Sequence, residues 1–301
     1  MTESGLLIVD KSGGMTSHDV VARVRKLAGT RRVGHAGTLD PMATGVLLIG
    51  IEKATRLLGH LALTEKEYAA TIRLGQSTVT DDAEGEVLSA PAAMTAAASE
   101  VSGEALRAAL ADLTGEILQV PPRVSAIKIN GKRAYHLTRS GAAPELAPRP
   151  VRISRLDLLA ARPDADFLDI DVAVTCSSGT YIRAIARDLG AALGTGGHLT
   201  VLRRTRVGPY QVADARTLDQ LGEHLEVTPL AQAAADAFPS LRLTAEQARL
   251  VSHGARLPAG DDRGDGAMTS GPLAAFDPDL NLIALLAEKD DEMQPLAVFV
   301  P

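Results

Sequence analysis

The stretch RRVGHAGTLDPMATGVL, residues 31–47, places three glycines, one histidine, one proline and one carboxylate between a basic pair and an apolar run. So many glycines make a loop costly to order, because glycine loses more backbone freedom on folding than any other residue. Pro41 also biases Asp40 toward an extended backbone. This entropic cost is understandable if the loop holds a functional side chain in a fixed position. The only carboxylate in the loop is Asp40. A purely structural turn is the alternative, because Asp and Pro are common turn residues.

The composition is that of a globular protein of one large domain or two. The chain has 301 residues, of which 46% are hydrophobic and 23% charged, so it can bury a sizeable core. Aromatic residues make up only 3% and Trp is absent, so aliphatic side chains must fill that core. The single cysteine, Cys176, excludes an internal disulfide, and the seven histidines have no metal-ligand spacing. No apolar run approaches the roughly 20 residues of a membrane span, and no secretory signal is recognisable. We therefore expect a cytoplasmic protein without a bound metal.

The charge is distributed unevenly along the chain. The net charge is −6, but residues 210–301 hold 15 acidic and 6 basic side chains, which is −9 and leaves residues 1–209 at +3. Residues 121–156 carry eight basic side chains against Glu145 alone. A local basic strip on an otherwise acidic chain suits an enzyme that binds RNA and must release it. A solvated charged face is the simpler alternative.

The hydrophobic pattern predicts an α+β fold. Strands are expected at residues 5–11, 46–51, 66–75 and 167–175. Helices are expected from Thr16 to Gly29, at 52–60, at 104–113, after the turn 177–180, and at 244–253. Between them, residues 31–45 are interpreted as a loop, 89–103 as a tolerant surface insertion, and 121–156 as an extended, partly mobile excursion. From about residue 236 the pattern indicates a small, acidic, β-rich appendix.

Most catalytic signatures are absent from the sequence. It contains no phosphate-binding loop, no dinucleotide fingerprint, no H-E-x-x-H and no G-x-S-x-G. A lone Asp on a rigid loop instead fits covalent catalysis by a carboxylate. Arg183, at the start of the helix that follows the clearest strand, is the candidate partner of Asp40, and we expect it to depress the pKa of that carboxyl. A flat ring could stack on Tyr68 or Tyr181.

Motifs in order across most of residues 5–208 resemble those of one enzyme family. The stretch GHAGTLDPMATGVL looks like the signature of the bacterial tRNA pseudouridine-55 synthases, the TruB family. Further motifs occur at 5–17 (G-x-L-x-x-D-K-x-x-G-x-T-S), 66–68 (K-x-Y), 119–131 (Q-x-P-P-x-x-S-A-x-K-x-x-G), 132–141 (K-R-A-Y-x-L-x-R-x-G), 178–189 (S-G-T-Y-I-R-x-x-x-x-D-L), 197–199 (GHL) and 202–205 (LRRT). Together they make a structural turn at Asp40 improbable.

The resemblance implies a pseudouridine synthase fold, with a mixed, largely antiparallel central sheet flanked by helices and crossed by the active-site cleft. It implies a catalytic domain at 1–235, with an RNA-clamping thumb at about 121–156, and a small PUA-like domain at 236–301. The activity implied is conversion of the T-loop uridine-55 of tRNA to pseudouridine by a monomer that uses neither cofactor nor metal. The target base would be flipped into the pocket.

The resemblance also assigns roles to individual residues. Asp40 matches the nucleophile and Arg183 its partner. The other matched positions are His35, which takes the place of the flipped base, Tyr68, which stacks on the uracil, Tyr181 and Leu202 in the pocket wall, and Lys11 near the site. Whether Asp40 attacks C1′ of the ribose, attacks C6 of uracil or acts through a glycal is left open.

Two departures from the family and three alternative functions accompany this interpretation. Val79 stands where the family usually has Asp within a Thr-Asp-Thr run, and the C-terminal appendix is acidic for an RNA-binding unit. A tRNA-folding chaperone would use the basic strip without chemistry at Asp40. A guide-RNA-dependent, dyskerin-type synthase is disfavoured because the chain has no Lys-rich extension. A hydrolase that uses Asp40 is the third alternative.

Overall fold

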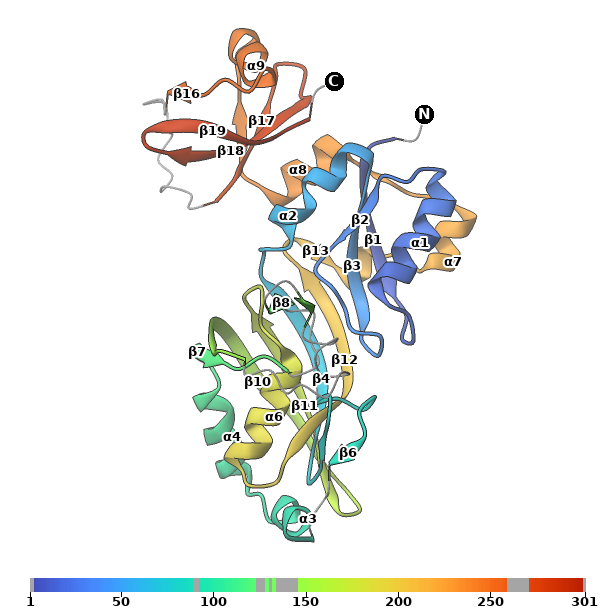
Figure 1. The fold of residues 1–301 in the computed structure, drawn as a ribbon, viewed down its shortest axis with the longest axis vertical. Helices are drawn as coiled ribbons and strands as arrows, with labels where there is room; N and C mark the ends of the chain where they lie inside the picture. Colours follow the sequence, from blue (N-terminus) through green and yellow to red (C-terminus); the bar gives the residue numbers. More distant parts are fainter. Residues whose placement is uncertain are drawn as a thin grey trace.

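The larger sheet of the computed structural model contains ten strands and is almost entirely antiparallel (Figure 1). The structure describes residues 3–88, 92–122, 128–129, 132–133, 146–258 and 271–299. The sheet order is β14 (Thr228–Pro229), β1 (Gly5–Lys11), β3 (Thr44–Ile51), β12 (Gly197–Val207), β4 (Lys66–Leu74), β11 (Phe167–Cys176), β10 (Arg149–Asp164) and β7 (Gly115–Gln119). Beside this path, β2 (Val33–Ala36) pairs with β3 and β13 (Tyr210–Gln211) pairs with β12.

The centre of this sheet is the junction of β3, β12 and β4. β12 pairs with β3 in parallel, with Arg203 opposite Thr44, and with β4 in antiparallel register. Burial along β4 alternates without interruption, so that every second side chain, starting with Lys66, faces the core. The predicted mixed, largely antiparallel sheet is confirmed.

The helices form where capping and apolar spacing agree. Thr16 and Asp19 form a reciprocal capping box at the start of α1 (Ser17–Ala28), and Gly29, with a φ of 62°, ends the helix. α4 (Gly103–Asp112), α6 (Ile182–Ala192) and α7 (Leu218–Glu223) also contribute buried side chains to the core of the large sheet. These helices hold the sheet rigid around its central strands.

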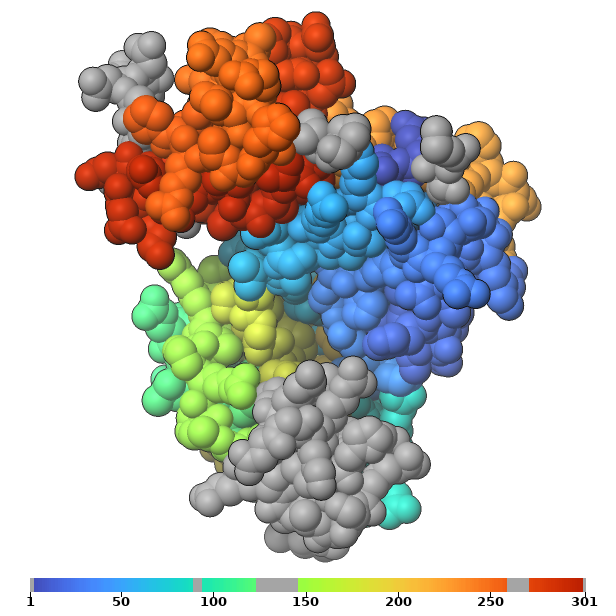
Figure 2. Space-filling view, turned by 45° about the horizontal axis from the view of Figure 1, so that its top comes forward, coloured from blue at the N-terminus to red at the C-terminus, as the bar shows by residue number. Residues whose placement is uncertain are grey.

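The last part of the chain forms a separate five-stranded sheet. Its order is β15 (Ser240–Arg242), β17 (Leu273–Phe276), β18 (Leu282–Lys289), β19 (Glu292–Val298) and β16 (Leu257–Pro258), with α9 (Ala245–Ser252) beside it. Side chains of α2 (Leu58–Leu61) and α8 (Leu230–Ala237) share a hydrophobic cluster with this sheet. Figure 2 shows the orange and red C-terminal residues packed against the light-blue segment that contains α2. The domain boundary at residue 236 stays a prediction.

Several local predictions are wrong in detail. Residues 33–36 of the expected loop form β2, because they pair with β3 from Ala36↔Leu48 to Val33↔Ile51. The expected helix at 52–60 is a 3-10 helix, η1 (Glu52–Arg56), followed by the single turn of α2. The expected surface insertion contains α3 (Ala92–Ser99), which buries Ala98 in the main core.

The predicted thumb at 121–156 is only partly described. Its last residues, from Arg149, belong to β10 and pair with β7, so this part is ordered sheet rather than an extended excursion. The pair β8 (Lys128–Ile129) and β9 (Lys132–Arg133) also forms, and the rest of the segment lies outside the described residues. The remaining small elements are β5 (Ser77–Thr78), β6 (Val87–Leu88) and η2 (Val212–Asp214).

Candidate active site

A cavity of about 260 Å³ opens at the centre of the large sheet, where β12 and β4 meet the loop between β2 and β3. This volume is below the range of drug-sized pockets, roughly 300–1,000 Å³, so the cavity suits a small group rather than an extended ligand. The lining residues are Gly37, Thr38, Leu39, Asp40, Ala62, Lys66, Tyr68, Gly179, Thr180, Tyr181, Ile182, Arg183, Leu202 and Arg204. Five predicted site residues therefore line the same cavity: Asp40, Tyr68, Tyr181, Arg183 and Leu202.

The loop that carries Asp40 is fixed from behind by hydrogen bonds to its backbone. Ser17 Oγ donates to the carbonyl of Leu39 (3.1 Å) and accepts from its amide (2.9 Å). The ammonium of Lys11, which has no exposed surface, donates to the carbonyl of Pro41 at 3.1 Å. The amide of Gly14 donates to the same carbonyl at 2.9 Å. Asp40 is thus held on both sides, which preorganises its carboxylate.

Arg204 holds the same loop by hydrogen bonds to backbone carbonyls near both of its ends. Its side chain is 1% exposed, and its Nε donates to the carbonyl of Val46 (2.7 Å) while Nη2 donates to that of Gly37 (2.9 Å). Gly45 makes this approach possible. Its φ is 100°, and a Cβ there would lie 2.1 Å from the backbone oxygen of Arg204. One buried guanidinium therefore ties together the two ends of the loop.

Arg183 joins Asp40 to the polar loop after β4. Its Nη2 donates to Asp40 Oδ1 at 3.2 Å, and its Nε lies 3.0 Å from Oδ2 in an ion pair without hydrogen-bond direction. On its other side, Nη1 donates to the carbonyl of Thr80 (3.0 Å) and lies 3.3 Å from Asp82 Oδ2. The Arg183 and Asp82 side chains are 7% and 3% exposed, whereas that of Asp40 is 34% exposed and faces the cavity. Asp40 is therefore the accessible carboxylate of this network.

The predicted depression of the Asp40 pKa is wrong. Burial raises the pKa of this carboxyl above its ordinary 3.8, Asp82 adds to the rise, and Arg183 opposes it only in part. The guanidinium divides its charge between two carboxylates, so it cannot offset the loss of water around Asp40. Asp40 is consequently a less solvated and more basic carboxylate than a surface aspartate.

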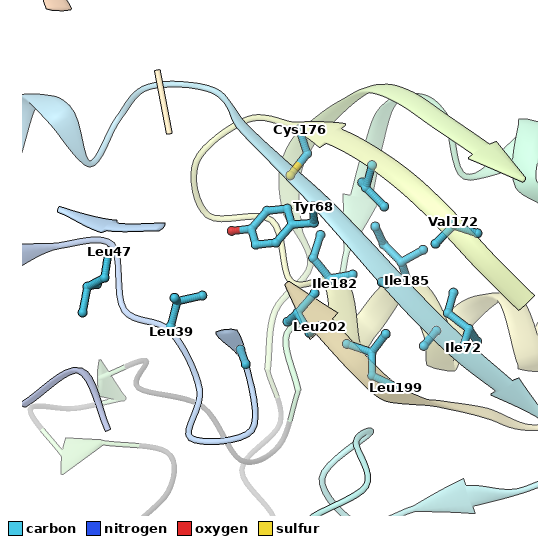
Figure 3. Packing of buried hydrophobic residues seen from close by; sticks show 14 of the residues in the cluster. Leu39, Leu47, Tyr68, Ile72, Val172, Cys176, Ile182, Ile185, Leu199 and Leu202 are labelled. Atoms are coloured by element: carbon cyan, nitrogen blue, oxygen red, sulfur yellow. The ribbon is translucent and has the colours of Figure 1, made fainter. Parts of the chain in front are cut away.

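Apolar and aromatic side chains form the rest of the wall (Figure 3). Tyr68 is 9% exposed, and its ring lies among Cys176, Ile182 and Leu202 with the hydroxyl directed away from its strand. Burial raises the pKa of this phenol, so the hydroxyl stays protonated. Leu202 is 6% exposed on β12. These surfaces suit the face of a planar ring.

Tyr181 is held at the start of α6 by a glutamine from β7. The Oε1 of Gln119 accepts from the Tyr181 amide (2.8 Å), and its Nε2 donates to the Tyr181 carbonyl (3.1 Å). Gln119 is 2% exposed, so this two-point contact is shielded from water. It fixes the first turn of the helix that also carries Arg183.

Two predicted site residues, His35 and Lys11, do not line the cavity. His35 lies on β2, where its ring meets that of His18 edge to face at 5.4 Å. Burial lowers the pKa of His35, which keeps the ring neutral. Lys11 acts on the backbone, through Pro41 and through the carbonyls of Ser12 (2.9 Å) and Met15 (2.7 Å).

Sequence reasoning missed four residues that build this site: Lys66, Asp82, Gln119 and Arg204. Three stand within motifs already singled out, namely K-x-Y, Q-x-P-P and LRRT, and Asp82 lies three residues after Val79, where the sequence departs from the family pattern. The available signal was the position of each charged or amide residue in or beside a motif shared with the family. Within the described ranges, no cluster of three or more His, Cys, Asp or Glu could hold a metal ion. No helix there is long and apolar enough to cross a membrane.

Comparison with known proteins agrees with this geometry. Three family models match in sequence: TruB family pseudouridylate synthase (N terminal domain) at 25–182, tRNA pseudouridylate synthase B C-terminal domain at 183–236, and tRNA Pseudouridine synthase II, C terminal at 238–300. The fold and site thus define the chain as one of the pseudouridine synthases.

Proteins with similar sequences show which family of pseudouridine synthases the chain belongs to. The tRNA pseudouridine synthase B of Arthrobacter sp. (strain FB24) is 60% identical over 99% of this chain and 97% of its own length. That of Thermobifida fusca (strain YX) is 57% identical over 98% of both chains. A solved Cbf5-Nop10-Gar1 complex matches 99% of this chain and 85% of its own with a TM-score of 0.73 at 26% identity. The chain belongs to the TruB family.

Proposed function

We propose that this protein is a tRNA pseudouridine synthase that isomerises the T-loop uridine at position 55, with Asp40 as the nucleophile. The observation that carries the proposal is the Asp40 carboxylate, paired with Arg183 and exposed to a cavity of about 260 Å³. Full-length relatives named tRNA pseudouridine synthase B support the reaction and the substrate class.

The cavity supports a mechanism that depends on base flipping. Asp40 is set in from the surface, so a uridine within a folded loop must leave its stack to reach it. Tyr68 and Leu202 then offer faces to the ring, while Arg183 holds the carboxylate in line. In the proposed reaction the uracil is detached from C1′, rotated and rejoined through C5. His35, which lies outside the cavity on the strand before the loop, would fill the space that the flipped base leaves.

The other parts of the proposal concern partners and surroundings. The basic residues of 121–156 would clamp the T-stem-loop against the site, because eight basic side chains in 36 residues favour phosphate contacts. The protein would act as a cytoplasmic monomer, without cofactor or metal. The acidic C-terminal sheet would contribute less to RNA affinity than the thumb.

The proposal is tested with a naked T-stem-loop transcript and no guide RNA. Wild-type protein should form pseudouridine at position 55, whereas Asp40→Asn should form none while binding the RNA with unchanged affinity. Asp169→Asn, a substitution in the Arg73 ion pair on β11, is the matched control and should retain activity. Turnover by Asp40→Asn would refute the assignment. A requirement for guide RNA would favour the dyskerin-type alternative, and full rescue of a null strain by Asp40→Asn would favour a tRNA-folding chaperone.

A further inference from the structure

Lys66 is a buried cation on the wall of the cavity. It is the first residue of β4 and lies two positions before Tyr68, so both side chains are on the core-facing side of the strand. It is 5% exposed and lines the same cavity as Asp40. Burying an ammonium without a carboxylate is costly, so such a position indicates a functional use of the charge.

The contacts of Lys66 leave one of its protons available. Its Nζ donates to the carbonyls of Ala62 (2.9 Å) and Thr64 (2.7 Å). An ammonium has three N–H donors, and among the described residues no third acceptor and no ion-pair partner is present. The Lys66 side chain also lies close to the loop that carries Asp40, since a Cβ on Gly37 would lie 3.5 Å from Lys66 Cε.

The charges around the cavity leave an excess of positive charge. Asp40 and, behind it, Asp82 share the single positive charge of Arg183, so that two further cations at the cavity would outweigh them. Arg204 and Lys66 also line the cavity, and neither forms an ion pair within the described part of the chain. Arg204 directs Nε and Nη2 at the carbonyls that close the loop. Lys66 is therefore the cation whose charge is available to an occupant of the cavity.

The proposed isomerisation produces a species that such a charge would stabilise. When the N1–C1′ bond breaks, its electron pair leaves with the uracil, and the negative charge is shared among N1, O2 and O4. Where Asp40 has displaced the uracil at C1′, the Asp40–C1′ bond breaks as the C5–C1′ bond forms; C5 then loses its proton to solvent, and N1 gains one from solvent. Attack at C6 or passage through a glycal also places negative charge on the ring. A donor aimed at a uracil carbonyl would act like an oxyanion-hole donor.

We propose that Lys66 is a further catalytic residue, whose free Nζ–H donates to a carbonyl oxygen of the uracil and stabilises the negative charge on the detached ring. This inference rests on the proposed pseudouridine synthesis. It gives the buried lysine a role separate from that of Asp40, because Lys66 stabilises the charge on the ring whichever atom Asp40 acts on.

The protonation of Lys66 sets a condition on this role. Burial and the neighbouring positive charge of Arg204 lower the pKa of Lys66 to about 8, whereas Cys176 on β11 raises it slightly. Asp40 and Tyr68 are further titratable groups that line the same cavity, and Tyr68 lies on the same strand as Lys66. The charged form is thus present below about pH 8 and is lost above it. The rate should fall on the alkaline side.

The test compares Lys66→Met and Lys66→Arg under single-turnover conditions, with enzyme in excess over a T-stem-loop. Two transcripts are used, one with uridine and one with 5-fluorouridine at the target, and loss of the target nucleoside is followed by digestion and chromatography. The fluorine at C5 itself stabilises negative charge on the uracil ring, so the fluorinated substrate depends less on Lys66. Lys66→Met should therefore slow the uridine transcript about 100-fold and the fluorinated one much less, with RNA affinity unchanged. Lys66→Arg should move the alkaline limb to higher pH. Lys289→Met, an exposed lysine of β18, is the matched control.

The outcomes separate this inference from the proposed function. Equal slowing of both transcripts by Lys66→Met, or no slowing, would overturn the role of Lys66 while leaving an active wild type in place. If Lys66→Met fails to fold, Lys66→Arg decides, and an unshifted alkaline limb overturns the role. A wild-type protein that forms no pseudouridine would overturn the proposed function and this inference together.

Discussion

Asp40 and Arg183 stand 143 residues apart in the chain, yet the guanidinium Nη2 reaches the carboxylate at 3.2 Å. Arg183 lies in the first turn of α6, while Asp40 lies on the loop between β2 and β3. The same guanidinium also contacts Thr80 and Asp82, so it joins three separate segments at the cavity. The position of the Asp40 carboxylate consequently depends on the packing of α6 against the sheet.

Removal of the Arg183 guanidinium should therefore slow the reaction at Asp40 itself, and not only weaken RNA binding. With Arg183→Met, two carboxylates remain next to each other without their cation, so the pKa of Asp40 should rise further. We expect a loss of at least about 100-fold in single-turnover rate, the order measured for losing one preorganised electrostatic contact. The loss should be smaller at higher pH.

Arg187→Met supplies the control for this experiment. Arg187 lies one turn further along α6, is 29% exposed and pairs with Asp81 and Asp188 rather than with Asp40. Its substitution should change the rate by only a few-fold. Equal losses for the two variants would show that charge on α6, rather than contact with Asp40, is what matters.

Asp82 should matter although it does not line the cavity. Asp82→Asn keeps the shape of the side chain but removes the charge that holds Arg183 from the side opposite Asp40. Removing one partner of a buried ion pair costs about 3–5 kcal/mol, so the rate should fall about tenfold or more even if only part of that loss reaches Asp40. The measurement is kcat against KM on the T-stem-loop. A change confined to KM would contradict a positioning role.

The sequence was sufficient to identify Asp40, Arg183 and the mixed sheet, because each depends on local pattern or on a motif. It gave the wrong direction for the Asp40 pKa, because sequence shows that an arginine is present but neither how deeply the carboxyl is buried nor that Asp82 competes for the same guanidinium. It also missed that residues 33–36 are a strand, since their pairing with β3 is set by the hairpin and not by their own composition.

Lys66 and Arg204 were missed for a related reason. Both are basic residues in or beside apolar strands, and a sequence pattern cannot distinguish a lysine at the solvent-facing edge of a strand from one buried at a cavity. Their partners are backbone carbonyls of Ala62, Thr64, Gly37 and Val46, which leave no trace in residue identity. Only the register of β4 against β12 brings these groups together.

The acid limb of the rate profile should report Asp40. The carboxylate must be ionised to act as a nucleophile, and burial raises its pKa above 3.8. Activity should therefore fall as the pH drops through this raised value, and the fall should begin at a higher pH than an exposed aspartate would give. Single-turnover rates across the acid range, with RNA binding measured in parallel, provide the check. A midpoint at or below 3.8 would contradict the effect of burial.

Gly45 should be the most sensitive glycine of the segment that carries Asp40. Its φ of 100° is strained for any other residue, and a Cβ there would meet the Arg204 carbonyl at 2.1 Å and its amide nitrogen at 2.9 Å. Gly45→Ala must therefore push β12 away from β3, which should cost about 3 kcal/mol or more of unfolding free energy. Gly14→Ala is the matched comparison, because Gly14 also has a positive φ, of 80°, but nothing lies within 4 Å of the added methyl group. It should cost only about 1 kcal/mol. Urea unfolding of the two variants measures the difference, and similar losses for both would mean that backbone strain, not the close approach of Arg204, makes glycine necessary at position 45.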